Sequence, residues 1–254
     1  ENAGIAVTRG ALASEASQIS AGHILRITKS RPFVQLKLAT GSDGLVPRGA
    51  KGPVWTTGEA ARAHGHLVRS QADAILVGSG TVAADDPELT CRLPGLSGSS
   101  PVRVVMSAKG AVKPGSRLLG TLDTAPLWLA VAQEHASDLE RTVGKTGAEV
   151  IQVPIMDGSE LLDPAVLLNE LALRGITRLL VEGGVRIAAS FHDLGLADEI
   201  LHYHAARPVG KNGIVPFNGE GIDSVTGSKE YKLAETRCFG EDALHRYQRI
   251  RKLQ

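Results

Sequence analysis

Aromatic residues and cysteines are scarce in this chain of 254 residues, and both shortages limit what the protein can be. Aromatic residues make up 4% of the sequence, so the core has to be built from Leu, Val, Ile and Ala. The two cysteines, Cys91 and Cys238, do not form a C-x-x-C pair, which excludes a zinc knuckle or a dithiol redox motif of that spacing. Such sparse cysteine usage is typical of a reduced, cytoplasmic protein, and we expect no disulfide.

Long apolar runs and clusters of one charge are also missing. No stretch reaches the roughly 18–20 apolar residues that a membrane helix needs, and no signal peptide is recognisable, so the sequence predicts no membrane association. The net charge is +1 and the basic residues are scattered, which disfavours a nucleic-acid-binding surface. The mildly basic end of the chain is typical of a solvated last element, and it contains Arg246, Arg249, Arg251 and Lys252.

Histidines are present, but not in a pattern that ligates a metal ion. His64 and His66 lie two residues apart on a predicted helix and therefore point to different faces. His202 and His204 share one face of a predicted strand, but no third ligand accompanies them. The sequence therefore predicts no metal site.

Short apolar runs alternate with amphipathic stretches along most of the chain. The runs are typical of buried strands, and the stretches between them have the periodicity of helices of about 10–15 residues. This alternation predicts an α/β fold with a mostly parallel central sheet and helices on both faces. Beyond residue 200 the chain becomes rich in glycine, which favours antiparallel C-terminal strands, for example at 200–205 and 246–250. Other strands are predicted at 33–39, 74–77, 102–107, 127–132 and 178–181, and helices at 57–70, 133–143 and 163–174.

Two of the predicted helices carry recognisable start signals. Thr57 is a candidate N-cap, with Glu59 in the first turn of the helix that follows. Asp163 followed by Pro164 is an N-cap with proline at the first helical position, and Gly175 supplies the stop at the other end.

Lys37 lies inside the apolar strand predicted at 33–39. Burying a lone ammonium group is costly, so two interpretations are open. Either the Lys37 side chain extends to solvent at a strand edge, or it meets an anion in a pocket. The pattern alone does not decide between them.

Two turns that follow buried strands are rich in small residues. Residues 78–87 are Gly-Ser-Gly-Thr-Val-Ala-Ala-Asp-Asp-Pro, and residues 180–184 are Leu-Val-Glu-Gly-Gly before a helix. Ligands of open α/β sheets gather at the carboxyl ends of strands, where glycines leave backbone amides free for a phosphate. Neither turn is a G-x-G-x-x-G fingerprint, and both are also compatible with ordinary structural turns. Nearby basic residues, either solvated or phosphate-binding, are Arg62, Arg69 and Arg92.

Taken together, these segments resemble the reductase domain of the bifunctional riboflavin-biosynthesis deaminase–reductase. The matching segments stand in the family's order and extend from about residue 31 to the end of the chain. The most specific of them is Gly-Ser-Gly-Thr-Val-x-x-Asp-Asp-Pro, placed before Val-Glu-Gly-Gly. The other matching segments are 31–39 (RPFVQLKLA), 42–44 (SDG), 55–62 (WTTGEAAR) and 73–90.

The resemblance implies a dihydrofolate-reductase-like fold, NADPH as the cofactor and a homodimer. The implied substrate is 5-amino-6-(5-phosphoribosylamino)uracil, whose ribosyl group is reduced to the ribityl group. Residues 31–254 are expected to form the reductase domain, and residues 1–30 resemble the linker that follows an absent deaminase domain. The zinc signature of that deaminase, His-x-Glu with Pro-Cys-x-x-Cys, is not in this sequence, so deamination is not expected.

The resemblance also assigns residues to the two ligands. Lys37 and Asp85 are implied to act in catalysis, where one of them or a bound water delivers the proton that accompanies the hydride. The residues implied for the cofactor are Ala39, Trp55, Thr81, Asp85, Gly183, Gly184, Val185, Arg186 and Ser190. The residues implied for the substrate are Lys37, Arg69, Leu89, Arg92 and Glu182. Arg103 and Lys109 are further candidates for contact with the 2′-phosphate of NADPH.

The sequence departs from the family pattern at several positions. Residues 41–44 are Gly-Ser-Asp-Gly instead of Ser-Leu-Asp-Gly, and Pro53 replaces a serine that contacts substrate. Ser107 and Ala108 replace Asp-Ser after the middle strand. Alternatives therefore stay open: a related reductase for another pterin or pyrimidine, a nucleotide-binding domain without catalysis, or a module that is active only with the deaminase half.

One spatial expectation underlies the proposed site. The turn after Val77 and the turn after Val181 must lie at the same edge of a single sheet, because only then do they form one cleft for a dinucleotide and a sugar phosphate.

Overall fold

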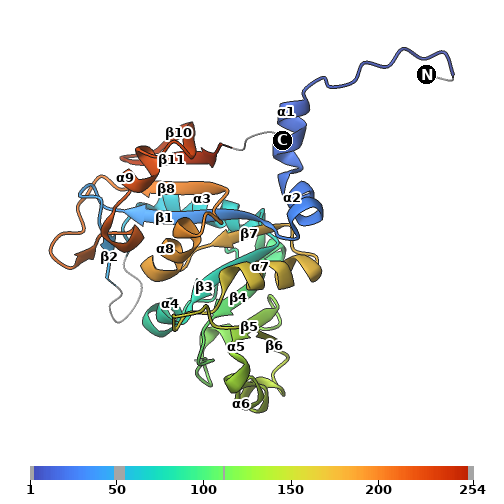
Figure 1. Cartoon of the computed structure of the whole chain (residues 1–254). Coiled ribbons are helices and arrows are strands. Elements are labelled where there is room, and N and C mark those ends of the chain that lie inside the picture. The colour runs from blue at the N-terminus through green and yellow to red at the C-terminus, as the bar shows by residue number, and fades with distance from the viewer. Residues whose placement is uncertain (1–2, 49–54, 111, 251–254) are drawn as a thin grey trace.

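A sheet of nine strands forms the centre of the computed structural model, which describes residues 3–48, 55–110 and 112–250 (Figure 1). The strand order is β10-β11-β8-β1-β7-β3-β4-β5-β6, and a separate antiparallel pair consists of β2 (Val46–Pro47) and β9 (Gly213–Ile214). The strands of the large sheet are β1 (Phe33–Thr40), β3 (Ala74–Gly78), β4 (Val102–Met106), β5 (Leu127–Val131), β6 (Glu149–Gln152), β7 (Arg178–Val181), β8 (Glu199–His204), β10 (Tyr231–Phe239) and β11 (Asp242–Arg249).

The sheet is parallel from β8 to β6 and antiparallel at its β11 and β10 edge. The predicted mostly parallel sheet with antiparallel C-terminal strands is therefore confirmed. The antiparallel prediction for residues 200–205 was wrong in part, because β8 runs parallel to β1 and antiparallel only to β11. The reason is that α8 (Val185–Asp193) forms a crossover between β7 and β8, which returns the chain to the same end of the sheet.

Helices cover both faces of the sheet. The core on one face receives side chains from α3 (Glu59–Ser70) and α6 (Gln133–Val143), and the core on the other face from α7 (Pro164–Leu173) and α8. Strands β3 and β5 are buried along their whole length, which explains why their sequences are continuous apolar runs. The shorter helices are α1 (Ala13–Ile19), α2 (Ala21–Lys29), α4 (Ser79–Asp85), α5 (Arg117–Gly120), α9 (Asp223–Thr226), η1 (Ser97–Ser99) and η2 (Phe217–Gly219).

The helix start signals differ in how well they predict the structure. The Asp163 side chain accepts hydrogen bonds from the amides of Ala165 and Val166, and Pro164 opens α7, as predicted. Thr57 was the wrong N-cap for α3, because the N-cap residue is Gly58.

The amide of Gly58 donates instead to the Asp242 carboxylate of β11, over 2.6 Å. A residue distant in sequence therefore supplies the acceptor that the local sequence appeared to offer through Thr57.

The N-terminal helices extend from one end of the sheet (Figure 1). Helix α1 contributes no buried residue, whereas α2 packs Ala21 and Leu25 against Phe33 of β1. Gly22 allows α2 to approach the chain before β7 closely, because a Cβ there would lie 2.5 Å from the Thr177 carbonyl oxygen. The N-terminal helices are therefore attached to the sheet through the packing of α2 and through hydrogen bonds from Arg178 of β7 to the Gln18 and Ile19 carbonyls of α1.

Both cysteines are free thiols; Cys91 is buried and Cys238 is exposed. Among the described residues, no helix combines the length and the apolar character required to cross a bilayer. Nor does this part of the chain bring three His, Cys, Asp or Glu side chains together in a way that could hold a metal ion.

Candidate active site

The two glycine-rich turns lie side by side at the carboxyl edge of neighbouring strands. Strands β3 and β7 are parallel neighbours, with Leu76 opposite Val181, and the Glu182 amide donates to the Leu76 carbonyl over 2.9 Å. The Gly184 amide donates to the Thr81 hydroxyl oxygen over 3.1 Å, which joins the second turn to the first. The spatial expectation from the sequence is therefore confirmed.

A cluster of charged side chains stands beside these turns. The Glu182 side chain is only 9% exposed, and Arg69 of α3 donates to both of its oxygens, from Nε over 2.8 Å and from Nη2 over 2.9 Å. The Lys37 ammonium lies 3.5 Å from Glu182 Oε2. Of the two interpretations of Lys37, the structure supports the one in which the ammonium meets an anion.

Glu182 and Arg69 hold each other in the charged state. Burial opposes ionisation of Glu182, but the positive charges of Arg69 and Lys37 outweigh it and keep the pKa of Glu182 well below its usual range. Burial also disfavours the guanidinium of Arg69, yet the Glu182 carboxylate raises the pKa of Arg69. Two cations share one carboxylate, so the cluster retains an excess positive charge that attracts an anionic ligand.

Tyr203 contacts Lys37 and is itself hydrogen-bonded to His64. Neither Tyr203 nor His64 was assigned to the site from the sequence. The Lys37 ammonium lies 5.5 Å from the centre of the Tyr203 ring, and the Tyr203 hydroxyl is 2.7 Å from His64 Nδ1. Burial raises the pKa of Tyr203, and the Glu182 charge adds to the rise, so the phenol stays neutral. The sequence could not indicate that Tyr203 lies near Lys37, because this proximity depends on the register of β1 with β8, which places Ala39 opposite Tyr203.

A cleft of about 380 Å³ opens over this cluster. It brings together most of the residues assigned to the substrate, and Trp55, assigned to the cofactor, stands 62% exposed at its wall with the Arg62 guanidinium 5.1 Å from its ring. Pro53, the departure expected to weaken substrate contact, lies outside the described residues. The assigned residues that line the cleft are Lys37, Trp55, Arg69, Arg92 and Glu182.

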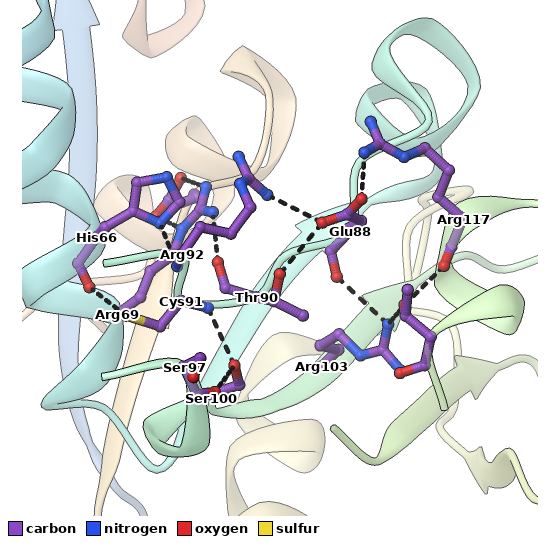
Figure 2. A network of polar contacts seen from close by, with 12 residues as sticks. His66, Arg69, Glu88, Thr90, Cys91, Arg92, Ser97, Ser100, Arg103 and Arg117 are labelled. Atoms are coloured by element: carbon purple, nitrogen blue, oxygen red, sulfur yellow. Dashed lines mark hydrogen bonds and ion pairs between the residues drawn. The ribbon is translucent and has the colours of Figure 1, made fainter. Parts of the chain in front are cut away.

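Residues 88–92, here called the substrate loop because Leu89 and Arg92 are assigned to the substrate, are held against α3 by hydrogen bonds, and Arg92 lines the cleft (Figure 2). Arg69 Nη1 donates to the Thr90 carbonyl over 3.2 Å, and the Arg92 amide donates to His66 Nδ1 over 3.3 Å. Leu89, assigned to the substrate, is 2% exposed and has a left-handed backbone with φ 59°. Such a backbone costs about 1–2 kcal/mol in a residue with a side chain, so these contacts stabilise the strained position.

Arg103 supports the substrate loop from the side of β4 (Figure 2). Its guanidinium is fully buried and donates to the Glu88 carbonyl over 3.3 Å, to the Thr121 hydroxyl over 2.6 Å and to the Ala125 carbonyl. The suggestion that Arg103 contacts the 2′-phosphate of a cofactor was wrong, because these protein oxygens occupy its donors. Lys109 is exposed, and its suggested role stays a prediction.

The side of the cleft edge assigned to the cofactor is formed mainly by backbone. A Cβ at Gly183 would lie 2.8 Å from Ile187 Cβ, and a Cβ at Gly78 would lie 2.9 Å from Ile187 Cγ1, so both turns need glycine to approach α8. Gly184 is the N-cap of α8 and makes no side-chain cap. Amides at the start of this helix are thus left without a capping side chain, which suits the phosphates of a dinucleotide.

The other residues assigned to the cofactor are placed less uniformly. Ala39 follows Lys37 on the same face of β1, and Arg186 is exposed in the first turn of α8. Asp85 ends α4 half-buried, and this burial raises its pKa. The Ser190 hydroxyl is buried in α8, without a hydrogen bond to the described residues. Val185, half-buried, opens the helix.

The parallel sheet, the paired turns and the charged cleft define an α/β protein with a ligand cleft at the carboxyl edge of its strands. The chain belongs to the RibD C-terminal domain family, whose model matches residues 32–245. It is 30% identical over 253 residues to the riboflavin biosynthesis protein RibD of Escherichia coli and 34% identical over 244 residues to that of Bacillus amyloliquefaciens. The matches cover 95% of this chain and 66% and 64% of those proteins, so the chain spans just under two thirds of their length.

A shorter relative matches over nearly its whole length. The 2,5-diamino-6-ribosylamino-4(3H)-pyrimidinone 5′-phosphate reductase of Methanothermobacter thermautotrophicus is 34% identical over 219 residues, which are 85% of this chain and 98% of the relative. The predicted resemblance to the reductase part of the riboflavin-biosynthesis deaminase–reductases is therefore confirmed as membership of the RibD C-terminal domain family.

Solved structures agree with this assignment. RibD of Acinetobacter baumannii has a TM-score of 0.80 at 23% identity and matches 98% of this chain and 67% of its own. The deaminase/reductase of Thermotoga maritima has a TM-score of 0.76 at 27% identity, with 98% and 65% matched. The Saccharomyces cerevisiae riboflavin biosynthesis reductase Rib7 has a TM-score of 0.67 at 21% identity, with 93% and 100% matched. These similarities confirm the predicted fold class.

Proposed function

We propose that this chain reduces the ribosyl group of 5-amino-6-(5-phosphoribosylamino)uracil to the ribityl group, with NADPH as the reductant. The observation that carries the proposal is the cluster of Lys37, Arg69 and Glu182, which lies in one cleft beside the paired glycine-rich turns. Membership in a family whose relatives are named as riboflavin-biosynthesis proteins and as a pyrimidinone phosphate reductase supports it.

The substrate side offers different donors for different parts of the ligand. Arg69 is committed to Glu182 by two hydrogen bonds, so it orients that carboxylate. Arg92 is 45% exposed and pairs with Glu88 at 3.4 Å, so it is the arginine with donors available for the substrate phosphate. Glu182 accepts hydrogen bonds from the substrate's polar groups, and Leu89 shapes the wall behind them.

The cofactor side fits NADPH, because the amides at the start of α8 have no capping side chain and can bind its phosphates. Bound NADPH supplies the hydride, and the protein supplies placement and charge. Lys37 or Asp85 delivers the proton, and the raised pKa of Asp85 keeps that carboxyl protonated to a higher pH than usual. The residues that hold the cofactor in this proposal are Ala39, Trp55, Thr81, Asp85, Gly183, Gly184, Val185, Arg186 and Ser190.

The proposal includes the setting of the reaction. The protein acts in the cytoplasm on a small molecule, as a homodimer, without a membrane or nucleic-acid partner. Residues 31–254 form the reductase unit, and residues 1–30 act as a linker to a deaminase domain. The match of the family model to residues 32–245 supports the first boundary, and the deaminase/reductase name of the Thermotoga maritima structure supports the linker.

The test follows NADPH oxidation by absorbance with the phosphoribosylaminouracil as substrate. We expect turnover by the natural chain and a large loss of kcat in both Lys37→Ala and Asp85→Asn, because each removes a candidate proton donor. Lys232→Ala, at an exposed position of β10, is the matched control and should retain the natural rate. Natural rates in both site variants would contradict the site assignment.

A second substrate is favoured by the Methanothermobacter thermautotrophicus relative, whose name specifies the 2,5-diaminopyrimidinone phosphate. Measuring kcat/KM for both pyrimidines side by side decides between the two substrates. NADPH binding without oxidation in the presence of either pyrimidine would instead indicate a nucleotide-binding domain that lacks catalysis.

A further inference from the structure

His66 is a side chain of the cleft that the proposed reaction leaves without a role. It lies on α3 three residues before Arg69, on the neighbouring turn of the same helix face. It lines the cleft together with Lys37, Arg92 and Glu182. His66 therefore stands where a bound substrate is expected.

The substrate loop fixes one edge of the His66 ring (Figure 2). The Arg92 amide donates to Nδ1 over 3.3 Å, and the Cys91 thiol donates to the His66 carbonyl over 3.3 Å. Because Nδ1 accepts a hydrogen bond, the proton of the neutral ring sits on Nε2. Among the described residues the ring also contacts the Thr90 backbone, whose carbonyl accepts from Arg69, and Nε2 forms no hydrogen bond of standard geometry with these residues, so its N–H is available to a ligand.

The charges around His66 keep its ring neutral. Burial is the largest cause, and the positive charges of Arg69 and Arg92 add to it, so the pKa of His66 falls to about 4 although the Glu182 carboxylate and the Thr90 backbone act in the opposite direction. At neutral pH the cleft thus contains an uncharged N–H donor among charged side chains. Such a donor can bind a ligand oxygen without adding to the positive charge of the cleft.

We propose that His66 is a further substrate-binding residue, whose ring is oriented by the Arg92 amide at Nδ1 and which donates a hydrogen bond from Nε2 to an oxygen of the substrate's sugar phosphate. The inference rests on the proposed function, because it names a contact with that substrate. It also explains why the substrate loop contacts this ring: the Arg92 amide orients the side chain that contacts the same ligand as Arg92.

Two substitutions separate the two edges of the ring. His66→Asn places an amide group near the position of Nδ1, so its oxygen can still accept from the Arg92 amide, but it has no group at the position of Nε2. His66→Gln places an NH₂ group near the position of Nε2 and loses the Nδ1 acceptor. A residue that only holds the substrate loop should tolerate Asn, whereas a residue that binds substrate should tolerate Gln better.

The experiment measures KM for the phosphoribosylaminouracil and for NADPH in both variants. We expect His66→Asn to raise the substrate KM by about tenfold, as for a lost hydrogen bond to a charged group, and His66→Gln to stay within about threefold of the natural chain. The KM for NADPH should change in neither. His23→Asn, at an exposed position of α2, is the matched control and should leave both KM values unchanged.

Other outcomes overturn the inference. A natural substrate KM in His66→Asn, or equal losses in Asn and Gln, would reduce His66 to a structural support of the loop. If the natural chain shows no turnover, the proposed function fails, and His66 is then judged by calorimetric binding of ribose 5-phosphate. Weaker binding by Asn than by Gln supports the contact, and equal binding by both overturns it. Melting temperatures of both variants identify any loss caused by unfolding.

Discussion

The substrate side and the cofactor side of the cleft are held together by different interactions. On the substrate side, Lys37, Arg69 and Glu182 hold each other through charges that are formed before any ligand arrives. On the cofactor side, the turns at Gly78 and Gly183 pack closely against Ile187 of α8 because they lack side chains, and the link between Thr81 and Gly184 is a single neutral hydrogen bond. We therefore expect substrate binding to be lost when one of these charges is removed, and cofactor binding to weaken when a side-chain atom is added to one of the glycines.

The largest effect is expected from removing the shared carboxylate. Glu182→Gln leaves Arg69 and Lys37 without their anion, so we expect kcat/KM to fall by at least about 100-fold and the free energy of unfolding by about 3 kcal/mol. Steady-state kinetics and denaturant unfolding measure the two quantities. Glu149→Gln is the control, because Glu149 pairs with Arg174 at the surface and its loss should cost less than about 1 kcal/mol. Equal costs for both variants would remove the distinction between the two sides.

A smaller effect is expected from adding one methyl group on the cofactor side. In Gly183→Ala the new Cβ would press on Ile187, so the turn must shift and the KM for NADPH should rise by about tenfold. The substrate KM should change little. Gly98→Ala is the matched control, because a Cβ at that position meets no atom within 4 Å. A selective rise in the substrate KM would show that the two sides are not separate.

Asp85 allows the cofactor side to be tested through the pH dependence of stability and of kcat. Burial raises its pKa above the ordinary value of 3.8, so the folded chain retains a proton that the unfolded chain has already lost. The stability from this group is present below the ordinary pKa and is lost as the pH rises through the folded pKa. Asp85→Asn should therefore flatten the pH dependence of unfolding in this acidic window and remove the Asp85 contribution to the pH profile of kcat. Superimposable profiles for the two chains would exclude Asp85 as the proton donor.

The smallest effect is expected from the hydrogen bond between the turns. Thr81→Val removes the oxygen that accepts from the Gly184 amide, and a neutral hydrogen bond contributes about 1 kcal/mol, so the KM for NADPH should rise by about fivefold. Thr81→Ser keeps the hydroxyl and should restore the natural value. A larger loss than in Gly183→Ala would reverse the order of effects expected for the cofactor side.

Local signals predicted the parts of the fold that depend on neighbouring residues. The sequence 133–143 predicted a helix whose bounds match α6, because its apolar residues recur with helical spacing. Asp163 with Pro164 marked the start of α7, because capping involves residues a few positions apart. Gly58 shows the limit of such signals. Its amide is paired with Asp242 from the other end of the chain, and nothing near Thr57 indicates that partner.

The candidate site was only partly visible in the sequence for the same reason. A lysine in an apolar strand indicated unusual chemistry at Lys37, but its anion, Glu182, comes from a strand far along the chain. The roles of Tyr203 and His66 depend on strand register and on a loop that folds back onto α3, which no local pattern contains. The same holds for Arg103, because its position on a strand did not indicate that its guanidinium donates to backbone carbonyls.

The position of β7 in the sheet determines the order in which the strands can pair during folding. Strands β1 and β3 are made early, yet β7 is inserted between them, and β8 then closes the other side of β1. Arg69 and its partner carboxylate, Glu182, are separated by 113 residues, so the ion pair cannot form until that much more of the chain has been synthesised. Pairing over such separations is slow, so a growing chain exposes an incomplete sheet edge until its last third emerges, and the ligand cleft is among the last features to assemble.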